Sequence, residues 1–414
     1  MTNPDVLIVG AGLAGLSCAL RLNLKGVSCL LLEASDDVGG RLRTDCVEGF
    51  QLDRGFQVLL TAYPEAKATL DYEALNLRYF ISGARVRYAG DFYDVIEPWR
   101  HPWRALGGWS SPIGKFADKW RVASFRRDLM ELPLADIFER PETSASKLVH
   151  DAGFSQSLID RFFRPFFGSI FLDSKLHASS RMFEFIFRML AEGEVAVPAK
   201  GMGAIPAQIA GRLPEGSIWR QAKAGSVEPG LVRLESGEEL RARCVVVATE
   251  GPEAAHLTGA FPAPASRPAT CVYYAAPEPP VADPILVLNG NNKWPVNNIC
   301  VLSQVAPEYA PQGQSLVSVT VLGRNTSNDA ALEPAVRRQL LRWFGRGVKD
   351  WRPLAIYRIP HAQPDQVPPG IPVEQLPVRI SPGLYVCGDH RDNASINGAL
   401  VSGRRAAEAI LEDS

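Results

Sequence analysis

The sequence predicts an α/β fold in which a parallel sheet is interrupted by an inserted α+β domain. Three observations predict this fold. An apolar strand near the N-terminus runs through a glycine-rich turn into a helix, and a second apolar strand follows it. A third strand near the C-terminus ends in Gly-Asp and is also followed by a helix. Strands that alternate with helices in this way are typical of a parallel sheet.

The first forty residues contain a complete strand–turn–helix–strand unit. We expect a strand over residues 5–9, a helix over 13–24 and a second strand over 27–32. In the GxGxxG turn, Gly10 permits the tight bend, Gly12 lets backbone approach a pyrophosphate, and Gly15 lets the helix pack closely on the strand. Glu33 ends the second strand, where it can accept hydrogen bonds from both hydroxyls of a ribose. This spacing predicts a dinucleotide-binding unit.

A pair of glycines follows this unit, at Gly39-Gly40-Arg41. Two interpretations stay open for it. The glycines bring backbone close to a phosphate whose charge Arg41 balances, or they form a plain turn beside a solvated arginine.

Composition narrows the class of protein. The chain has 414 residues, 46% hydrophobic residues and a net charge of −1, which predicts two or three domains and gives no electrostatic support for nucleic-acid binding. Its seven cysteines show no CxxC pair and no metal-ligand spacing, so we expect reduced thiols, no metal and a cytoplasmic protein. No apolar stretch is long enough to span a bilayer, and the N-terminus lacks the features of a signal peptide.

Residues 98–192 are rich in aromatic side chains and are predicted to be helical. One interpretation is the packed core of a helical subdomain. The other is an apolar substrate cavity, with the Trp- and Arg-rich stretch that contains Trp99, Trp103 and Trp109 resting on a membrane surface. Beyond this region, residues 244–249 read as a buried parallel strand and residues 271–323 as an antiparallel sheet. A helix is expected over 332–344, and the proline-rich stretch 360–377 as an ordered connection.

The C-terminal region adds a second set of polar groups to the sheet edge. A strand over residues 383–387 ends in Gly388-Asp389, and a helix begins near Ser395-Ile396-Asn397. An acid at the carboxyl end of a strand can hold a polyol hydroxyl, while the first amides of the helix face a ring or a phosphate.

Together these motifs resemble the flavin-dependent amine oxidase superfamily, which includes phytoene and squalene desaturases and protoporphyrinogen oxidase. The resemblance implies a Rossmann-like, glutathione-reductase-like FAD-binding domain built from residues 1–80, 198–265 and 355–414, and a substrate domain built from 81–197 and 266–354. It implies FAD as cofactor, contacted by Gly10, Ala11, Gly12, Ala14, Gly15, Glu33, Ala34, Gly40, Arg41, Leu42, Gly55, Phe56, Gln57, Val58, Gly388, Asp389, Ser395, Ile396 and Asn397.

One departure from the family bears on the reaction. Amine oxidases of this family keep a lysine near the flavin on an early strand of the substrate domain, and residues 269–274 contain none. The helical stretch 162–190 is most similar to the desaturase branch. The resemblance therefore implies an FAD-dependent desaturase or dehydrogenase, or a related isomerase or saturase, that acts on a lipophilic polyene or isoprenoid by hydride transfer to flavin N5.

Two alternatives stay open. The first is an amine or amino-acid oxidase that releases hydrogen peroxide, with Arg164 or Arg181 holding a substrate carboxylate. The second is a flavin-binding protein without catalysis. No acid–base pair stands out, so no catalytic residue is assigned from the sequence. We expect a lipophilic small molecule as partner and peripheral contact with the inner face of a membrane.

Overall fold

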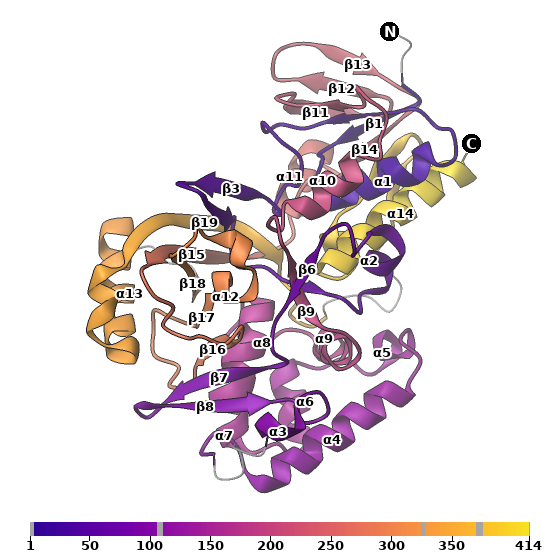
Figure 1. The fold of residues 1–414 in the computed structure, drawn as a ribbon. Helices are drawn as coiled ribbons and strands as arrows, with labels where there is room; N and C mark the ends of the chain where they lie inside the picture. Colours follow the sequence, from indigo (N-terminus) through magenta and orange to yellow (C-terminus); the bar gives the residue numbers. More distant parts are fainter. Residues whose placement is uncertain (1–3, 106–110, 324–327, 370–375, 414) are drawn as a thin grey trace.

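The computed structural model describes residues 4–105, 111–323, 328–369 and 376–413, and side chains outside 104–105 within these ranges. Trp109 and part of the stretch 360–377 lie outside the described residues. The chain forms a mixed α/β fold with one parallel sheet and several antiparallel sheets (Figure 1).

The parallel sheet has six strands in the order β10-β2-β1-β14-β21-β20. Four neighbouring pairs are parallel, and β20 joins the edge in antiparallel orientation. Valine, leucine and isoleucine fill β1 and β14, which are buried along their whole length, as expected for strands covered on both faces. The strands are β1 (Val6–Val9), β2 (Cys29–Leu32), β10 (Ile218–Trp219), β14 (Cys244–Val247), β20 (Arg379–Ser381) and β21 (Leu384–Val386).

Two helices from opposite ends of the chain cover one face of this sheet. They are α1 (Leu13–Asn23) and α14 (Ile396–Glu412), which lie side by side in Figure 1. A Cβ atom added at Gly403 would lie 2.2 Å from the carbonyl oxygen of Ala14, so the close approach requires glycine there. Ser17 Oγ also donates a hydrogen bond to the carbonyl of Leu400 at 2.8 Å. The N- and C-terminal segments therefore form one packed unit.

The opposite face is covered by smaller elements from the middle of the chain. They are a three-stranded antiparallel sheet and α11 (Gly251–Thr258), which bury Val232, Leu234 and Leu257 against Leu7 and Val247. The strands are β11 (Ala224–Glu228), β12 (Leu231–Leu234) and β13 (Glu239–Arg241).

A second sheet has seven strands in the order β19-β15-β18-β17-β16-β7-β8. Its pairs are antiparallel except for β16 with β7, so the antiparallel sheet expected within 271–323 is confirmed. One face packs on α13 (Asp329–Phe344) and the other faces the helical layer. The strands are β7 (Gly83–Tyr88), β8 (Asp91–Ile96), β15 (Ser266–Ala276), β16 (Leu286–Asn289), β17 (Asn298–Val301), β18 (Ser315–Leu322) and β19 (Arg352–Pro364).

The structure differs from the sequence expectation at one domain boundary. The FAD-binding domain was expected to resume at residue 355, which falls inside β19. Because β19 pairs with β15 from Ala275↔Arg352 to Ser266↔Pro364, the whole strand belongs to the seven-stranded sheet. Its exposed and half-buried residues give no sequence signal of that pairing. The division into two domains stays a prediction, with this boundary moved to the end of β19.

The helical layer lies below and to the right of the seven-stranded sheet in Figure 1. A π-helical turn, η2 (Ile159–Phe163), joins α7 to α8, and π-turns are frequent at functional sites. Phenylalanine rings from α8 and α9 pack on one another, with the centroids of Phe167 and Phe183 4.1 Å apart. The helices are α3 (Pro102–Ala105), α4 (Phe116–Glu131), α5 (Asp136–Glu139), α6 (Ala145–Asp151), α7 (Gln156–Leu158), α8 (Arg164–Phe171) and α9 (Ser180–Glu192).

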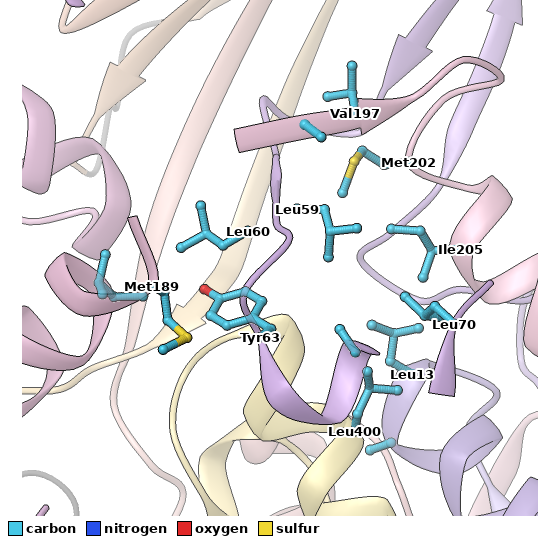
Figure 2. Close-up of a cluster of buried hydrophobic side chains, with 14 of the residues drawn as sticks. Leu13, Leu59, Leu60, Tyr63, Leu70, Met189, Val197, Met202, Ile205 and Leu400 are labelled. Carbon is cyan, nitrogen blue, oxygen red and sulfur yellow. The ribbon is translucent and has the colours of Figure 1, made fainter. Parts of the chain in front are cut away.

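A small sheet of order β5-β9-β6 connects the two halves of the molecule. Around it, a cluster of buried side chains contains Leu13 of α1, Leu59 of β5, Ile205 of α10 and Leu400 of α14 (Figure 2). One core thus extends from the parallel sheet to the helical layer. The remaining elements are α2 (Pro64–Thr69), α10 (Ala204–Ala210), α12 (Leu302–Val305), β3 (Thr44–Val47), β4 (Phe50–Asp53), β5 (Leu59–Leu60), β6 (Leu77–Tyr79), β9 (Val195–Pro198) and the short 3-10 turns η3 (Pro307–Tyr309), η4 (Arg346–Asp350) and η5 (Asp389–Arg391).

Among the described helices, none combines the length and the apolar character that crossing a bilayer requires.

Candidate functional site

One cavity of about 900 Å³ connects the parallel sheet with the helical layer. At one end it is lined by the carboxyl ends of β1, β2 and β14, through Val9, Leu32 and Ala248. We call this end the glycine-rich half. At the other end it is lined by η2, α8 and α9, with the seven-stranded sheet as a side wall. We call this end the aromatic half. Ligands of open parallel sheets bind outside the carboxyl ends of the strands, which is where the glycine-rich half lies.

The turn between β1 and α1 forms part of the wall of the glycine-rich half. A Cβ atom at Gly10 would lie 2.9 Å from the carbonyl oxygen of Ala248, and one at Gly15 would lie 2.0 Å from the carbonyl oxygen of Gly10. Packing therefore requires both glycines. Gly12 differs, because a Cβ atom there would meet no protein atom within 4 Å. The N-terminus of α1 thus borders open space, and its first amides lack partners within the helix, as an anion site requires.

Glu33 at the end of β2 is fixed in place by the turn opposite. Its Oε2 accepts a hydrogen bond from the amide of Ala11 at 2.9 Å, and its Oε1 accepts from the amide and the hydroxyl of Ser35 at 2.9 and 2.7 Å. A carboxylate has roughly four acceptor positions. The protein thus occupies three of them, which leaves capacity for about one ligand hydroxyl rather than the two expected from the sequence.

Arg41 and Asp389 form an ion pair on the cavity wall, with 2.7 Å between Nη2 and Oδ1. Nη1 of Arg41 also donates to the carbonyl of Ala362 at 2.9 Å. Burial lowers the pKa of Arg41, but the charge and the hydrogen bond of Asp389, together with the charge of Glu250, outweigh burial, so the pKa lies above its ordinary value. Of the two interpretations of Gly39-Gly40-Arg41, the solvated arginine is wrong. The Arg41 guanidinium is paired and lines the cavity.

Two glutamines on the cavity wall carry buried oxygen atoms without a partner. Gln57 Nε2 donates to the carbonyl of Arg41 at 2.9 Å, and Gln363 Nε2 donates to the carbonyl of Ala394 at 2.8 Å. In each side chain the amide nitrogen is satisfied and Oε1 has no hydrogen-bond partner among the described residues. A buried polar atom without a hydrogen bond destabilises the folded protein. Both oxygens therefore indicate a bound molecule that donates hydrogen bonds to them.

The N-terminus of α14 also borders the cavity, through Ser395, Ile396 and Ala399. Ser395 caps the helix, because its Oγ accepts from the amide of Gly398 at 3.0 Å. Asn397 points elsewhere. Its Oδ1 accepts from the amide of Glu65 at 2.9 Å, so the side chain holds α2 against α14.

The structure brings the residues predicted to bind the cofactor together around the glycine-rich half. All of them line the cavity except Ala11, Gly15 and Asn397. Ala11 contributes its amide to Glu33, Gly15 packs on Gly10, and Asn397 bonds to Glu65. These three therefore support the site through neighbouring residues, and their contact with a cofactor stays a prediction.

Several lining residues were not identified from the sequence. Ala222, Lys223 and Ala224 lie near Glu33, and Thr249 and Glu250 follow β14. Burial raises the pKa of Glu250, and the charges of His361 and Arg41 offset part of this effect. The position of Thr249 and Glu250 at the end of a buried parallel strand is a signal that could have found them. The segment 222–224 has no motif of its own.

Asp53 joins the glycine-rich half to the seven-stranded sheet. Its carboxylate accepts hydrogen bonds from Thr44 Oγ1, the amide of Met202 and the hydroxyl of Tyr309, at 2.6 to 2.9 Å. Its carbonyl accepts from the hydroxyl of Tyr273 at 2.8 Å. Burial raises the pKa of Asp53 to about 6, although these hydrogen bonds oppose the shift. The carboxylate thereby fixes β4 just before Gly55, which lines the cavity.

The aromatic half is walled by hydrocarbon. The π-turn and α8 together contribute a continuous aromatic surface, in which the rings of Phe162 and Phe166 stack in parallel with centroids 5.3 Å apart. Both rings are half-buried and face the cavity. Of the two interpretations of the aromatic residues in 98–192, both are partly right, because the same helices form a packed core and a cavity wall. The aromatic residues of the lining are Phe56, Tyr63, Phe80, Trp99, Phe162, Phe163, Phe166, Phe167, Phe171 and Phe187.

Charged residues of the aromatic half gather at its rim, beside the half-exposed Trp99. Arg100 donates to the carbonyls of Leu190 and Ala191 at the end of α9 and pairs with Glu97 at 3.1 Å. Arg126 of α4 lies 5.1 Å from the centroid of the Trp99 ring. Burial raises the pKa of Glu97 against the opposing charges of Arg100 and Arg126. These contacts hold the rim in a fixed arrangement.

The wall between the two halves contains Thr270 and Cys271 of β15, where related amine oxidases were expected to carry a lysine. Burial raises the pKa of Cys271 to about 11, so the thiol is neutral near pH 7. Among the described lining residues the lysine is Lys223, in the glycine-rich half. Lys200 is exposed and does not line the cavity. His390, which follows Asp389, is buried beside the cavity, and burial lowers its pKa to about 4.

The glycine-rich half fits FAD on four observations. Open space lies in front of Gly12, two helix N-termini border the cavity, Arg41 supplies positive charge, and Gln57 and Gln363 present unpaired acceptors. A pyrophosphate suits the first three features, and the N–H and O–H donors of a flavin and its polyol chain suit the fourth. Gly12, Glu33, Arg41, Gln57 and Asp389 are the residues that would hold this cofactor.

Comparison with known proteins agrees with this geometry. The sequence model for flavin containing amine oxidoreductases matches residues 13–411. Coproporphyrinogen III oxidase of Mycobacterium bovis is 24% identical over 469 aligned residues, which cover 100% of this chain and 98% of that protein. The protein of the same name from Mycobacterium leprae aligns at 38% identity over 81 residues, 18% of its length.

Hydroxysqualene dehydroxylase of Rhodopseudomonas palustris is 27% identical, and the alignment covers 98% of each chain. An oxidoreductase from Methanosarcina mazei has a solved structure with a TM-score of 0.75 to this one at 18% identity, covering 98% of this chain and 99% of that one. The family model spans nearly the whole chain, from the first helix of the glycine-rich half to α14. The chain therefore belongs to the family of flavin containing amine oxidoreductases, and it is an FAD-dependent oxidoreductase.

Proposed function

We propose that this protein is an FAD-dependent desaturase or dehydrogenase, or a related isomerase or saturase, of a lipophilic polyene or isoprenoid. In this proposal the parallel sheet is the core of a Rossmann-like, glutathione-reductase-like FAD-binding domain, and residues of the substrate domain bind the lipophile. The observation that carries the proposal is the aromatic half of the cavity, which is walled by phenylalanine rings and has its charges at the rim.

The composition of this wall decides between classes of substrate. Burying apolar surface is favourable by about 25 cal/mol per Å², whereas burying a charged group without a partner is strongly unfavourable. A long hydrocarbon fills such a space and leaves few polar groups unpaired. The stacked pair Phe162 and Phe166 adds a flat surface for a conjugated chain.

Two relatives support a lipophilic substrate by name. Hydroxysqualene dehydroxylase is similar over nearly its full length, and 4,4'-diapolycopene oxygenase of a Methylomonas species is 44% identical over 57 residues. Squalene and diapolycopene derivatives are long isoprenoid chains. The coproporphyrinogen oxidases act, by name, on a different ring-shaped substrate, so the wall chemistry rather than similarity alone favours the isoprenoid class.

In the reaction, FAD when bound supplies the acceptor for a hydride from a substrate carbon. The residues of this chain position the substrate against the cofactor and exclude water from the cavity. Phe162 and Phe166 hold the hydrocarbon against the wall, Asp389 and Gln57 hold the cofactor side, and the fixed rim around Arg100 limits the access of water. The proton that leaves the substrate passes to solvent or to a carrier, because among the described residues the acids and bases of the aromatic half lie at the rim.

We further propose that the rim rests on an anionic membrane surface, from which a lipophile would enter. Trp103 of α3 is 85% exposed and Trp120 of α4 is 69% exposed, and Phe116 lies one helical turn before Trp120. Lys115 and Lys119 are exposed on the same turns. Exposed aromatic rings beside basic residues are typical of surfaces that bind the headgroup region of a bilayer. Trp109, which was expected to contribute, lies outside the described residues.

The alternative of an amine or amino-acid oxidase has less support from the site. Arg164 pairs with Asp160 at 3.1 Å, and Arg181 donates to the carbonyl of Arg140 at 2.7 Å. Neither arginine lines the cavity. Neither of the two arginines that the sequence suggested is therefore placed to hold a substrate carboxylate.

The test is anaerobic reduction of the bound flavin, followed by its visible absorbance. Isoprenoid hydrocarbons and polyenes in detergent micelles should bleach the flavin, and primary amines and amino acids should not. Phe166→Arg should retain FAD and lose bleaching by the lipophiles, because it places a charge in the apolar wall. Phe166→Leu is the matched control and should keep the activity. Bleaching by an amine, with hydrogen peroxide released on return of air, would overturn the proposal.

A further inference from the structure

The face of the seven-stranded sheet that bounds the cavity carries one row of polar side chains. Residues of this sheet alternate between the face toward α13 and the face toward the helical layer, and most residues of the second face are apolar. Cys271 of β15, Thr320 of β18 and Asn298 of β17 stand next to one another in register on that face. Leu288 of β16 continues the row.

Two members of this row carry buried hydrogen-bonding atoms without a partner. Thr320 is 7% exposed and lines the cavity, and its Oγ1 has no hydrogen-bond partner in the part of the chain that the structure describes. Asn298 is 1% exposed, and its Nδ2 has none. Its Oδ1 accepts from Asn297 Nδ2 at 3.2 Å, which fixes the direction of the amide. Asn298 stands opposite Thr320 in the sheet but is not among the residues that line the cavity, so of the two unpaired groups it is Thr320 Oγ1 that a bound molecule can reach.

Other hydroxyls in the aromatic half are satisfied by the protein. Ser169 Oγ donates to the carbonyl of Phe166 at 2.6 Å, and Ser82 Oγ donates to Glu194 at 3.3 Å. Cys271 has Ser318 Oγ at 3.3 Å. Thr320 therefore differs from the other described hydroxyl-bearing residues that line that half. A hydrocarbon that filled the cavity would displace water from its hydroxyl and offer no hydrogen bond in return. Removing water from such a group without replacing the hydrogen bond is unfavourable.

We infer that Thr320, with Asn298 beside it, forms a subsite for a single oxygen atom carried by the lipophilic ligand, as a hydroxyl or a carbonyl. The ligand oxygen accepts a hydrogen bond from Thr320 Oγ1, while the rest of the molecule lies on the phenylalanine wall. This inference rests on the proposed function and narrows it. The ligand is an oxygenated isoprenoid rather than a pure hydrocarbon.

The test compares two ligands that differ in this oxygen. The probes are geranylgeraniol and the hydrocarbon that has a methyl group in place of its CH2OH group, each in detergent micelles. The holoenzyme is first reduced with dithionite and kept anaerobic, so that no hydride transfer occurs during the titration. Dissociation constants are measured by calorimetry. We expect the alcohol to bind about tenfold more tightly than the hydrocarbon.

Two variants and one control test whether Thr320 causes the preference for the alcohol over the hydrocarbon. Thr320→Val keeps the shape of the side chain and its preference for a strand, and it should weaken the alcohol about tenfold while leaving the hydrocarbon within about twofold. Thr320→Ser restores a hydroxyl and should restore the preference. Ser318→Ala is the matched control, because Ser318 lies two residues away on the same strand face and bonds to Cys271. It should change neither constant.

Each outcome has a defined meaning. Equal binding of the two probes to the wild-type protein, or an unchanged preference in Thr320→Val, would overturn the oxygen subsite and leave the proposed function standing. Failure of both probes to bind the wild-type protein would overturn both. A changed visible spectrum of ligand-free Thr320→Val would place the hydroxyl against the cofactor and would also overturn the subsite. Loss of preference in Thr320→Val with rescue by Thr320→Ser supports it.

Discussion

Arg41 and Asp389 are 348 positions apart in the chain, and their side chains form a 2.7 Å ion pair on the wall of the cavity. The arginine follows the paired glycines near the N-terminus, and the aspartate ends the Gly-Asp strand near the C-terminus. The two cofactor motifs are therefore joined by a direct contact in the protein itself.

This contact predicts strong energetic coupling between the two side chains. Arg41→Ala leaves the buried Asp389 carboxylate without its cation, and we expect a loss of about 3 kcal/mol in the free energy of unfolding of the apoprotein. The double variant with Asp389→Ala should cost less than the sum of the single variants, with a coupling energy of about 2 kcal/mol from urea unfolding.

The matched control for this cycle is the exposed pair Lys147 and Asp151, which also lies at 2.7 Å. Both side chains are well exposed, so their coupling should stay below about 0.5 kcal/mol. Additive effects of Arg41→Ala and Asp389→Ala would contradict the prediction.

The glycine turn predicts a separation of folding from cofactor binding. In Gly12→Ala the added methyl group meets no protein atom, so the apoprotein should fold with its stability unchanged or slightly raised. The methyl group occupies the space in front of α1, and FAD affinity should fall by at least about tenfold, measured by fluorescence titration of the apoprotein.

Gly15→Ala should show the opposite pattern. Its methyl group would lie 2.0 Å from the carbonyl oxygen of Gly10, so α1 must shift from the sheet and the melting temperature should fall. Loss of folding in Gly12→Ala, or normal stability in Gly15→Ala, would show that the roles of the two glycines are wrongly assigned.

Asp53 predicts a specific dependence of stability on pH. Its pKa is about 6 in the folded protein and 3.8 in its ordinary state, so the folded state binds the proton more tightly. The contribution of Asp53 to the free energy of unfolding is fully present below about pH 4. It is lost as the pH rises through 6, by about 3 kcal/mol in total. Asp53→Asn does not titrate. Relative to wild type, its free energy of unfolding should therefore rise by about 3 kcal/mol between pH 4 and pH 7 in urea titrations.

Asp45 is the control, because its contribution to stability changes with pH in the opposite direction. Burial raises its pKa, but hydrogen bonds from Arg54 and Tyr357 outweigh burial and lower it overall. Its contribution is present above the ordinary pKa and is lost as the pH falls. Parallel stability curves for wild type and Asp53→Asn across this range would contradict the prediction.

The exposed aromatic side chains of α3 and α4 predict binding to vesicles. Replacing Trp103 and Trp120 by serine should reduce the fraction of holoenzyme that sediments with vesicles of phosphatidylserine and phosphatidylcholine by at least about fivefold. Trp294 is 58% exposed and lies on the loop between β16 and β17, outside α3 and α4, so Trp294→Ser is the matched control. Equal sedimentation of all three proteins would exclude the membrane contact.

Much of the fold could be predicted because its signals are local. The glycines at positions 10, 12 and 15 and the apolar run from Cys244 indicate strand, turn and helix through backbone conformation and burial over a few residues. The helix after Ser395 follows from the same kind of signal. Such features depend little on the rest of the chain.

The glycine-rich half can be predicted from short-range spacing alone, because that spacing specifies turn geometry, helix N-termini and strand ends. The residues that face it depend on long-range packing. That β19 joins the seven-stranded sheet, that Asn397 bonds to Glu65, and that Thr320 and Asn298 stand unpaired side by side all depend on contacts between segments far apart. Register across strands and the direction of a side chain into a cavity have no local signature, since the free energy that selects them arises only when the packed layers meet.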